Sequence, residues 1–290
     1  SLALGAGRRP AAELMFAACA FLIGCVGQEF WRGARARRAM SGEALPVALV
    51  SLVRRNRRRY GGYLVHAGVA LLFVGIAASS AFQHVVTPTL QVGQTAKVDG
   101  YAVHYDRPTA TITTKAGRLE KINLGSDLTV RRGSSVVTRL HTERGYYPTD
   151  DSSLGVVSRY FEGEQTSEVG LHAGARRDIW TVITPDTDPL RGIISQGDKV
   201  FGNAKNLPAP MAAALLGQAI RGIVDRYERN PPPAQFRFII SPLVSWIWIG
   251  ALIILFGGLI SIWPPPGGAT SRVRARYLAR VARETAPTTP

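Results

Sequence analysis

The chain has 290 residues, of which 46% are hydrophobic, and it carries a formal net charge of +15. Its mean hydropathy of +0.05 would fit a soluble protein, but the apolar residues are concentrated in three long runs, and this excludes a protein that is soluble throughout. The basic residues lie beside these runs, where anionic lipid accounts for them, so the charge does not point to a protein that binds nucleic acid.

The first apolar run covers residues 11–31 and is interrupted only by Glu13 and Glu29, near its two ends. We expect a transmembrane helix within residues 1–31. Cys19 and Cys25 both lie in this run, six positions apart, where a helix points them to different sides, so we do not expect a disulfide between them. The chain begins with Ser1 and has no signal-peptide pattern, which indicates a fragment of a longer protein.

A strongly basic segment follows. Residues 32–59 hold nine Arg and one Glu, and the stretch from Pro46 to Val53 is typical of a short amphipathic helix at a membrane surface. Residues 60–82 then run without a formal charge for long enough to cross a hydrocarbon core of roughly 30 Å. We therefore predict a cytoplasmic basic loop at 32–59 and a transmembrane helix at 60–82.

The pattern changes in residues 83–237, which we predict to form one exported domain rich in β-strands. Apolar and polar residues alternate from Thr89 to Tyr105, and Asp99-Gly100 between alternating runs is a strong hairpin signal. Strands continue to Glu143, with breaks expected at Gly117, Gly125 and Gly133, and further strands are expected at 154–161, 167–171 and 178–184. Residues 208–229 have the periodicity of one amphipathic helix.

A third transmembrane helix is predicted at residues 238–263, followed by a basic tail at 264–290 that holds five Arg and one Glu. Because Lys and Arg favour the cytoplasmic side, the loop at 32–59 and the tail are expected inside and the middle domain outside. The predicted fold class is an α+β membrane protein, multi-pass in a bacterial inner membrane. Its transmembrane helices flank an extracytoplasmic, mainly-β domain that is like a small barrel or sandwich.

His66 is the histidine that lies inside an apolar run. It falls six residues beyond the cytoplasmic edge of its helix, about 9 Å deep at roughly 1.5 Å per residue. An ionisable side chain at that depth is a functional candidate by default, and neutral imidazole is a common ligand of haem iron. A second interpretation is that His66 only hydrogen-bonds a neighbouring helix. Gly61, Gly62, Gly68 and Gly75 are compatible with both, because small residues let either a flat macrocycle or another helix approach.

Other candidate residues lie near the ends of the predicted spans. Arg57, Arg58 and Arg59 are candidate contacts for haem propionates, although the positive-inside rule alone accounts for them. Trp246 and Trp248 are either interfacial anchors or an aromatic surface beside a haem.

The four remaining histidines are His84, His104, His141 and His172. His84 follows the outer end of its span and is either a polar tip at the interface or a contact for an extracytoplasmic ligand. The other three lack metal-ligand spacing, and we expect structural roles for them. No Ser-His-Asp pattern, Walker A motif or dinucleotide-binding glycine motif occurs in the sequence.

Four blocks of sequence resemble the C-terminal part of the CcmF family of cytochrome c maturation proteins, also called CycK or Ccl1. They are NRRRYGGYLVHAGVALLFVGIAASSAF at 56–82, ERGYYP at 143–148, SEVGLHAGARRDIW at 167–180 and PLVSWIWIGALIILFGGLISIWP at 242–264. The resemblance implies a subunit of a haem lyase that takes haem from a CcmE-type chaperone. The lyase attaches this haem to apocytochrome c presented by a CcmH-type subunit.

The resemblance also implies that His66 is one of two axial ligands of a haem b in the membrane, which relays electrons from quinol to the incoming haem. The second ligand and the Trp-rich haem-handling motif belong to the family's upstream part, so no catalytic residue is expected in this chain, and a separate upstream half must complete the lyase. Two other hypotheses stay open: a non-catalytic, membrane-anchored scaffold that binds apocytochrome or a maturation partner without a haem of its own, and a fragment of a transporter.

Overall fold

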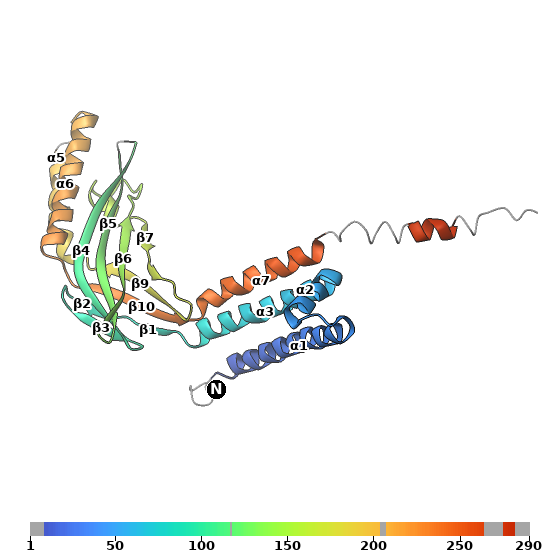
Figure 1. Ribbon diagram of the computed structural model, residues 1–290. Coiled ribbons are helices and arrows are strands. Elements are labelled where there is room, and N and C mark those ends of the chain that lie inside the picture. The colour runs from blue at the N-terminus through green and yellow to red at the C-terminus, as the bar shows by residue number, and fades with distance from the viewer. Residues whose placement is uncertain (1–8, 117, 204–206, 264–274, 282–290) are drawn as a thin grey trace, which may run out of the picture. The chain divides into compact units, whose positions relative to one another are not determined.

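The computed structural model describes residues 9–116, 118–203, 207–263 and 275–281 (Figure 1). The chain divides into two compact units, one formed by residues 1–77 and 246–290 and the other by residues 78–245. Three of the described helices are long and apolar enough to cross a membrane, and they match the three predicted spans. The predicted tail at 264–290 lies mostly outside the described residues.

The first unit consists of helices. It contains α1 (Pro10–Ser41), α2 (Leu45–Arg55), α3 (Arg57–Ala81) and α7 (Val244–Ile262). α1 continues ten residues past the predicted span and ends at Gly42, whose positive φ of 67° suits glycine. α2 confirms the short helix expected around Pro46. Much of the segment predicted as a basic loop is therefore helical.

Glycines bring α3 and α7 into backbone contact. A Cβ added to Gly61 would lie 2.7 Å from the carbonyl oxygen of Gly257, and one added to Gly68 would lie 2.8 Å from that of Gly250. The converse also holds, since a Cβ on Gly257 would lie 2.8 Å from the carbonyl oxygen of Gly61. On each helix the two glycines are seven residues apart, two turns along one face. This packing confirms that Gly61 and Gly68 permit close approach, whereas Gly62 has open space beside it.

The second unit contains two antiparallel sheets and several helices. One sheet is formed by β1 (His84–Val86), β2 (Thr89–Leu90), β8 (Gly170–His172), β9 (Arg177–Pro185) and β10 (Ala234–Pro242). The other is formed by β3 (Thr95–Val98), β4 (Tyr101–Lys115), β5 (Arg118–Arg132), β6 (Ser135–Tyr146) and β7 (Gln165–Glu168). The helices are α4 (Ser158–Phe161), η3 (Asp188–Leu190), α5 (Arg191–Asn203) and α6 (Ala209–Arg229). The α+β class and the helix expected at 208–229 are confirmed.

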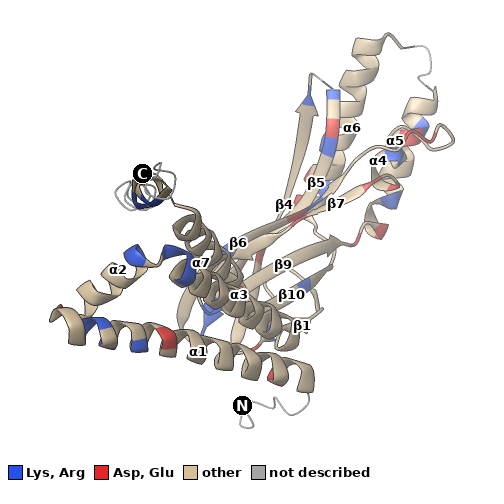
Figure 2. Ribbon diagram, turned by 90° about the vertical axis from the view of Figure 1, so that its right-hand side faces the viewer, with Lys and Arg blue, Asp and Glu red and all other residues tan. Residues whose placement is uncertain are grey.

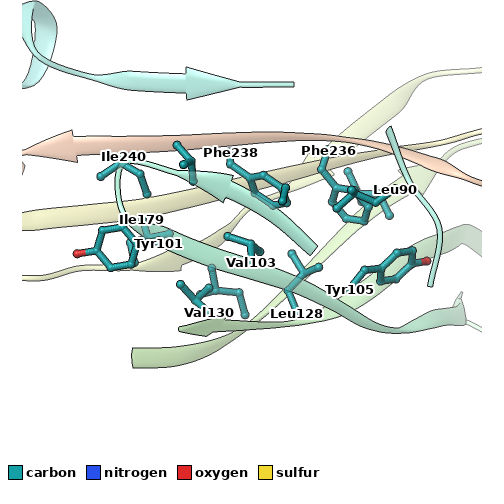
Figure 3. Packing of buried hydrophobic residues seen from close by; sticks show 14 of the residues in the cluster. Leu90, Tyr101, Val103, Tyr105, Leu128, Val130, Ile179, Phe236, Phe238 and Ile240 are labelled. Carbon is teal, nitrogen blue, oxygen red and sulfur yellow. The ribbon is translucent and has the colours of Figure 1, made fainter. Parts of the chain in front are cut away.

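One face of β5 covers two cores. Its residues Leu128 and Val130 pack with Phe236 and Phe238 of β10, so that the first core lies between the two sheets (Figure 3). Further along the same face, Ile122 and Leu124 pack with residues of α4, α5 and α6 in the second core. Alternate side chains of a strand share a face, which explains how one long strand serves both cores. All six of these side chains are fully buried.

The last predicted span began too early. Residues 234–242 form β10, the strand that pairs with β9 on one side and with β1 and β2 on the other, and α7 begins only at Val244. A strand buried inside a sheet is nearly as apolar as a membrane span, so FIISP was added to the helix that follows. The middle domain accordingly extends about five residues beyond the predicted boundary at 237.

Two predictions within the middle domain were also wrong. Residues 154–161 form a turn and the helix α4 in place of a strand, because Asp198 of α5 accepts hydrogen bonds from the backbone amides of Val157 and Ser158 at 2.7 and 3.2 Å. Gly125 does not break a strand. It lies inside β5, where a Cβ would come within 2.7 Å of the carbonyl oxygen of Thr142, so this glycine serves close strand packing.

A row of charged side chains crosses the outer surface of the second sheet. Arg107 of β4 donates to Asp127 of β5 at 2.7 Å, and Nδ1 of His141 on β6 lies 2.8 Å from Asp127. Nε2 of His141 lies 3.3 Å from Glu143. Partial burial lowers the pKa of His141, but the hydrogen bonds to Asp127 and Glu143 outweigh it and the pKa is raised. His141 is therefore held in place by two carboxylates.

We expect the Asp127→Asn substitution to lower the pKa of His141, because it removes the nearer of the two negative charges. An NMR titration of the histidine ring measures this shift, with Asp150→Asn, in an exposed loop, as the control. Because the pKa of His141 is higher in the folded chain, its contribution to stability is present at acidic pH and is lost as the pH rises through that pKa. A titration that is unchanged by Asp127→Asn would contradict the pairing.

For the helical unit we expect Gly257→Ala to lower Tm, since the new methyl group would overlap the backbone of α3 at Gly61 and Val65. Overpacking of this kind costs about 1–3 kcal/mol, which corresponds to a fall of several degrees. Gly258→Ala is the matched control, because nothing lies within 4 Å of its Cβ position. Thermal unfolding of both variants in detergent checks this, and equal melting temperatures would show that α3 and α7 do not pack as described.

Candidate functional site

His66 lies on the side of α3 that faces neither α7 nor α1. Gly61 and Gly68 face α7, while Tyr60 and Tyr63 make ring contacts with Phe30 of α1 at centroid distances of 5.0 and 6.3 Å. The side chain of His66 is exposed. The same face of α3 also carries, at helical spacing, Gly62, Val69, Phe73 and Ile76. The last two are 42% and 41% exposed. His66 therefore sits on an open, largely apolar face.

The imidazole of His66 has a defined tautomer. Its Nδ1 lies 2.7 Å from the carbonyl oxygen of Gly62, one turn earlier in α3. A carbonyl oxygen can only accept a hydrogen bond, so Nδ1 carries the proton, and the Nε2 of the neutral ring keeps its lone pair. Metal-bound histidines use the same arrangement, in which one ring nitrogen donates to a carbonyl and the other binds the metal. Among the described residues, no other side-chain hydrogen bond is recorded for His66, so the interpretation that it bonds a neighbouring helix gains no support.

The surroundings of His66 meet some of the requirements for an axial ligand of haem. The free Nε2 and the apolar surroundings suit haem iron and the faces of its macrocycle. Within the residues that the structure describes, however, no three His, Cys, Asp or Glu side chains come together as metal ligands. The chain can supply one ligand from α3, and a second ligand would have to come from elsewhere.

Of the three arginines predicted to contact propionates, Arg59 lies on the side of α3 nearest His66. It is seven residues away, about 10 Å along the helix axis. Arg59 is already engaged: its guanidinium lies 2.5 Å from the carboxylate of Glu29 on α1 and donates to the hydroxyl of Tyr63 at 3.0 Å. Arg57 points to another side of α3, whereas Arg58 lies one turn before Gly62, at the edge of the His66 face. The three arginines therefore lie together at the start of α3, and two of them are on or near the side of His66.

Glu29 is a functional candidate that the sequence reasoning passed over. It lies in the first apolar run, pairs with Arg59 and sits 3.3 Å from the hydroxyl of Tyr63. A carboxylate within an apolar run is costly unless it is paired, so its presence there already signalled a partner. The ion pair ties α1 to α3 beside the ring contacts with Phe30.

Trp246 and Trp248 do not form one surface. Positions two apart on a helix point to nearly opposite sides. Trp246 is partly buried and lies on the side of Gly250, which faces α3, whereas Trp248 is 72% exposed. At most one of the two could border any single ligand.

The other histidines lie in the second unit and each has its own surroundings. Nδ1 of His84 is 3.9 Å from Asp99, and Nδ1 of His104 is 2.9 Å from the hydroxyl of Thr95. His141 belongs to the charged row described above, and His172 ends β8. The contacts of His104 and His141 agree with the structural roles predicted for them.

Comparison with known proteins gave two similarities, and no family model matches the chain. The cytochrome c-type biogenesis protein Ccl1 of Rhodobacter capsulatus is 24% identical over 215 residues, which cover 73% of this chain and 23% of that protein. This chain therefore spans about a quarter of the length of its curated relative. Among solved structures, cytochrome c haem lyase CcmF matches with a TM-score of 0.42 and 18% identity, covering 83% of this chain and 34% of CcmF. The match to Ccl1 confirms the predicted resemblance: this chain is similar to the cytochrome c biogenesis proteins of the CcmF and Ccl1 family.

Proposed function

We propose that this chain is the C-terminal part of a haem lyase for cytochrome c maturation and that it supplies His66 as one axial ligand of a haem b within the membrane. One observation carries the assignment. The hydrogen bond from Nδ1 to the Gly62 carbonyl leaves Nε2 free on a face of α3 that no described helix covers. The sequence match to Ccl1, a cytochrome c-type biogenesis protein, supports the same role.

In this proposal the residues of the chain hold and orient the cofactor. The Gly62 carbonyl fixes the ring of His66 and keeps the proton on Nδ1, and the side chains of Phe73 and Ile76 offer apolar contacts on the same face. The pairing of Arg59 with Glu29 holds α1 against α3. Haem b, when bound at His66, would supply one-electron chemistry. The chain itself carries out no proton transfer or bond formation in this proposal.

The remaining parts of the lyase are assigned to other chains. An upstream half would supply the second axial ligand and the haem-handling surface. A CcmE-type chaperone would deliver haem, a CcmH-type subunit would present apocytochrome c, and quinol would donate electrons. In this proposal the arginines of residues 32–59 lie on the cytoplasmic side of a bacterial inner membrane and the second unit lies outside, an orientation that the concentration of Arg beside the apolar helices supports.

We expect His66→Ala to abolish the b-type absorption band in reduced-minus-oxidised spectra of the chain purified with its upstream partner, because the iron loses an axial ligand. His84→Ala is the control, since that histidine lies outside the apolar helices and its Nδ1 is 3.9 Å from the carboxylate of Asp99. His66→Gly with added imidazole should restore the band, as a free ligand can enter the space that the side chain leaves. An unchanged band in His66→Ala would refute the assignment of His66.

A second candidate function, a scaffold that docks a partner protein, is favoured by a specific feature of the first sheet. Four apolar side chains lie in register across the outer face of its strands, from β1 through β10 and β9 to β8. They are Val85, Ile239, Trp180 and Leu171. Three of them are 36–50% exposed. Paired residues in a sheet share a face, so the row is continuous, and such a patch is typical of a protein-binding surface.

If this row binds apocytochrome or a maturation partner, the double substitution Leu171→Asp and Trp180→Asp should abolish co-purification of the partner and leave the haem band intact. The two charges would have to be buried in the interface, which is costly. Val136→Asp, at a valine that is 48% exposed on β6 of the other sheet, is the control. Undiminished co-purification of the double variant would exclude the row as the docking surface.

A further inference from the structure

The junction between α2 and α3 forms a strongly basic hollow. Five arginines occupy positions 54, 55, 57, 58 and 59, around Asn56, and line a cavity of about 490 Å³. The opposite wall is the end of α7, from Ser261 to Trp263. Figure 2 shows Lys and Arg gathered at this junction. Among the residues that the structure describes, none that lines the hollow is acidic.

For three of these arginines, the described residues offer no acidic partner. Arg59 has its partner in Glu29. Within the described part of the chain, no carboxylate is recorded beside Arg54, Arg55 or Arg58, and all three side chains are exposed. Like charges held this close repel one another, and a bound anion would relieve that repulsion. Guanidinium groups bind phosphate oxygens with two parallel hydrogen bonds, which makes phosphate the anion that suits them best.

An apolar hollow adjoins the basic one. It has a volume of about 350 Å³ and is lined by Val53 of α2 and by Phe256, Leu259 and Ile260 of α7. Arg54, Arg57 and Trp263 line both hollows, so the two lie side by side. A ligand that fills both would carry an anionic head and a hydrocarbon tail.

We propose that the two hollows bind one anionic phospholipid, with its phosphate among the arginines at 54–58 and an acyl chain along Phe256 and Leu259. The site is separate from His66 along the helix, because α3 contributes to it only residues 57–59, which lie at least seven positions, or about 10 Å, before His66. The proposal requires only that the apolar helices lie in a membrane, and it does not rest on the haem role of the chain.

The test uses the full chain in detergent and measures retained lipid by native mass spectrometry after exposure to dioleoyl phosphatidylglycerol or dioleoyl phosphatidylcholine. We expect preferential binding of phosphatidylglycerol. In the triple variant Arg54→Gln, Arg55→Gln, Arg58→Gln its affinity should fall by about tenfold or more, since each basic residue near an anionic headgroup contributes measurably. The matched control is Arg32→Gln, Arg35→Gln, Arg38→Gln, which removes the same charge from α1 outside the hollow and should retain the lipid.

A second pair of variants tests the acyl part without altering any charge. Phe256→Ser should weaken binding several-fold, whereas Leu252→Ser, at a residue of similar exposure on α7 but outside the hollow, should not. If the two triple variants lost affinity for phosphatidylglycerol equally, the proposal would be overturned, because the binding would then reflect general attraction of positive charge to anionic lipid. Inorganic phosphate or glycerol phosphate that displaces the lipid at equal concentration would also overturn it, since the site would then bind the anion alone.

Discussion

Four glycines let the backbones of α3 and α7 touch, and the other features of the first unit are arranged around that contact. Gly61 meets Gly257 and Gly68 meets Gly250, so the two pairs lock the rotation of α3 about its own axis. With that face fixed, the ring contacts of Tyr60 and Tyr63 with Phe30 turn a second face toward α1. The face that remains carries His66. The exposure of the imidazole is thus a consequence of packing on the other sides of its helix.

The second unit depends on a different constraint, namely the length of β4 and β5. Each strand has 15 residues, which is enough for one face to be covered first by the other sheet and then by helices. Gly125 lies between the two cores, where the hydroxyl of Tyr227 on α6 approaches its carbonyl oxygen at 3.5 Å. Burial raises the pKa of the phenol of Tyr227 far above its usual range, and the neighbouring hydroxyl of Tyr105 raises this pKa further. One sheet face thus serves two different packing partners.

The sequence predicts those parts of the fold in which a local pattern is sufficient. The three apolar runs, the short helix after Pro46 and the helix at 209–229 follow from hydrophobicity and periodicity. Residues 154–161 could not be assigned in this way, because the helix there is capped by Asp198 from a segment about 40 positions away. α5 was missed since Gly192, Gly197 and Gly202 weaken its helical signal.

The same division applies to the candidate site. The depth of His66 in its apolar run could be read from the sequence, whereas its hydrogen bond to Gly62 and the direction of its face depend on the helix neighbours. The pairing of Arg59 with Glu29 joins two helices and leaves no trace in local spacing. Trp246 and Trp248 were grouped because they are close in sequence, although helical geometry already separates them.

The length of α1 has a mechanical consequence. Its 32 residues make a rod of about 48 Å, which exceeds a hydrocarbon core of about 30 Å. In a bilayer the part of α1 that exceeds the hydrocarbon core would project from it as rigid helix. The last turns of α1 carry Arg32, Arg35 and Arg38. α2 packs back against α1, and Ala34 of α1 and Ala48 of α2 are both buried. A projection of this kind would set the height of the basic junction above the lipid acyl chains.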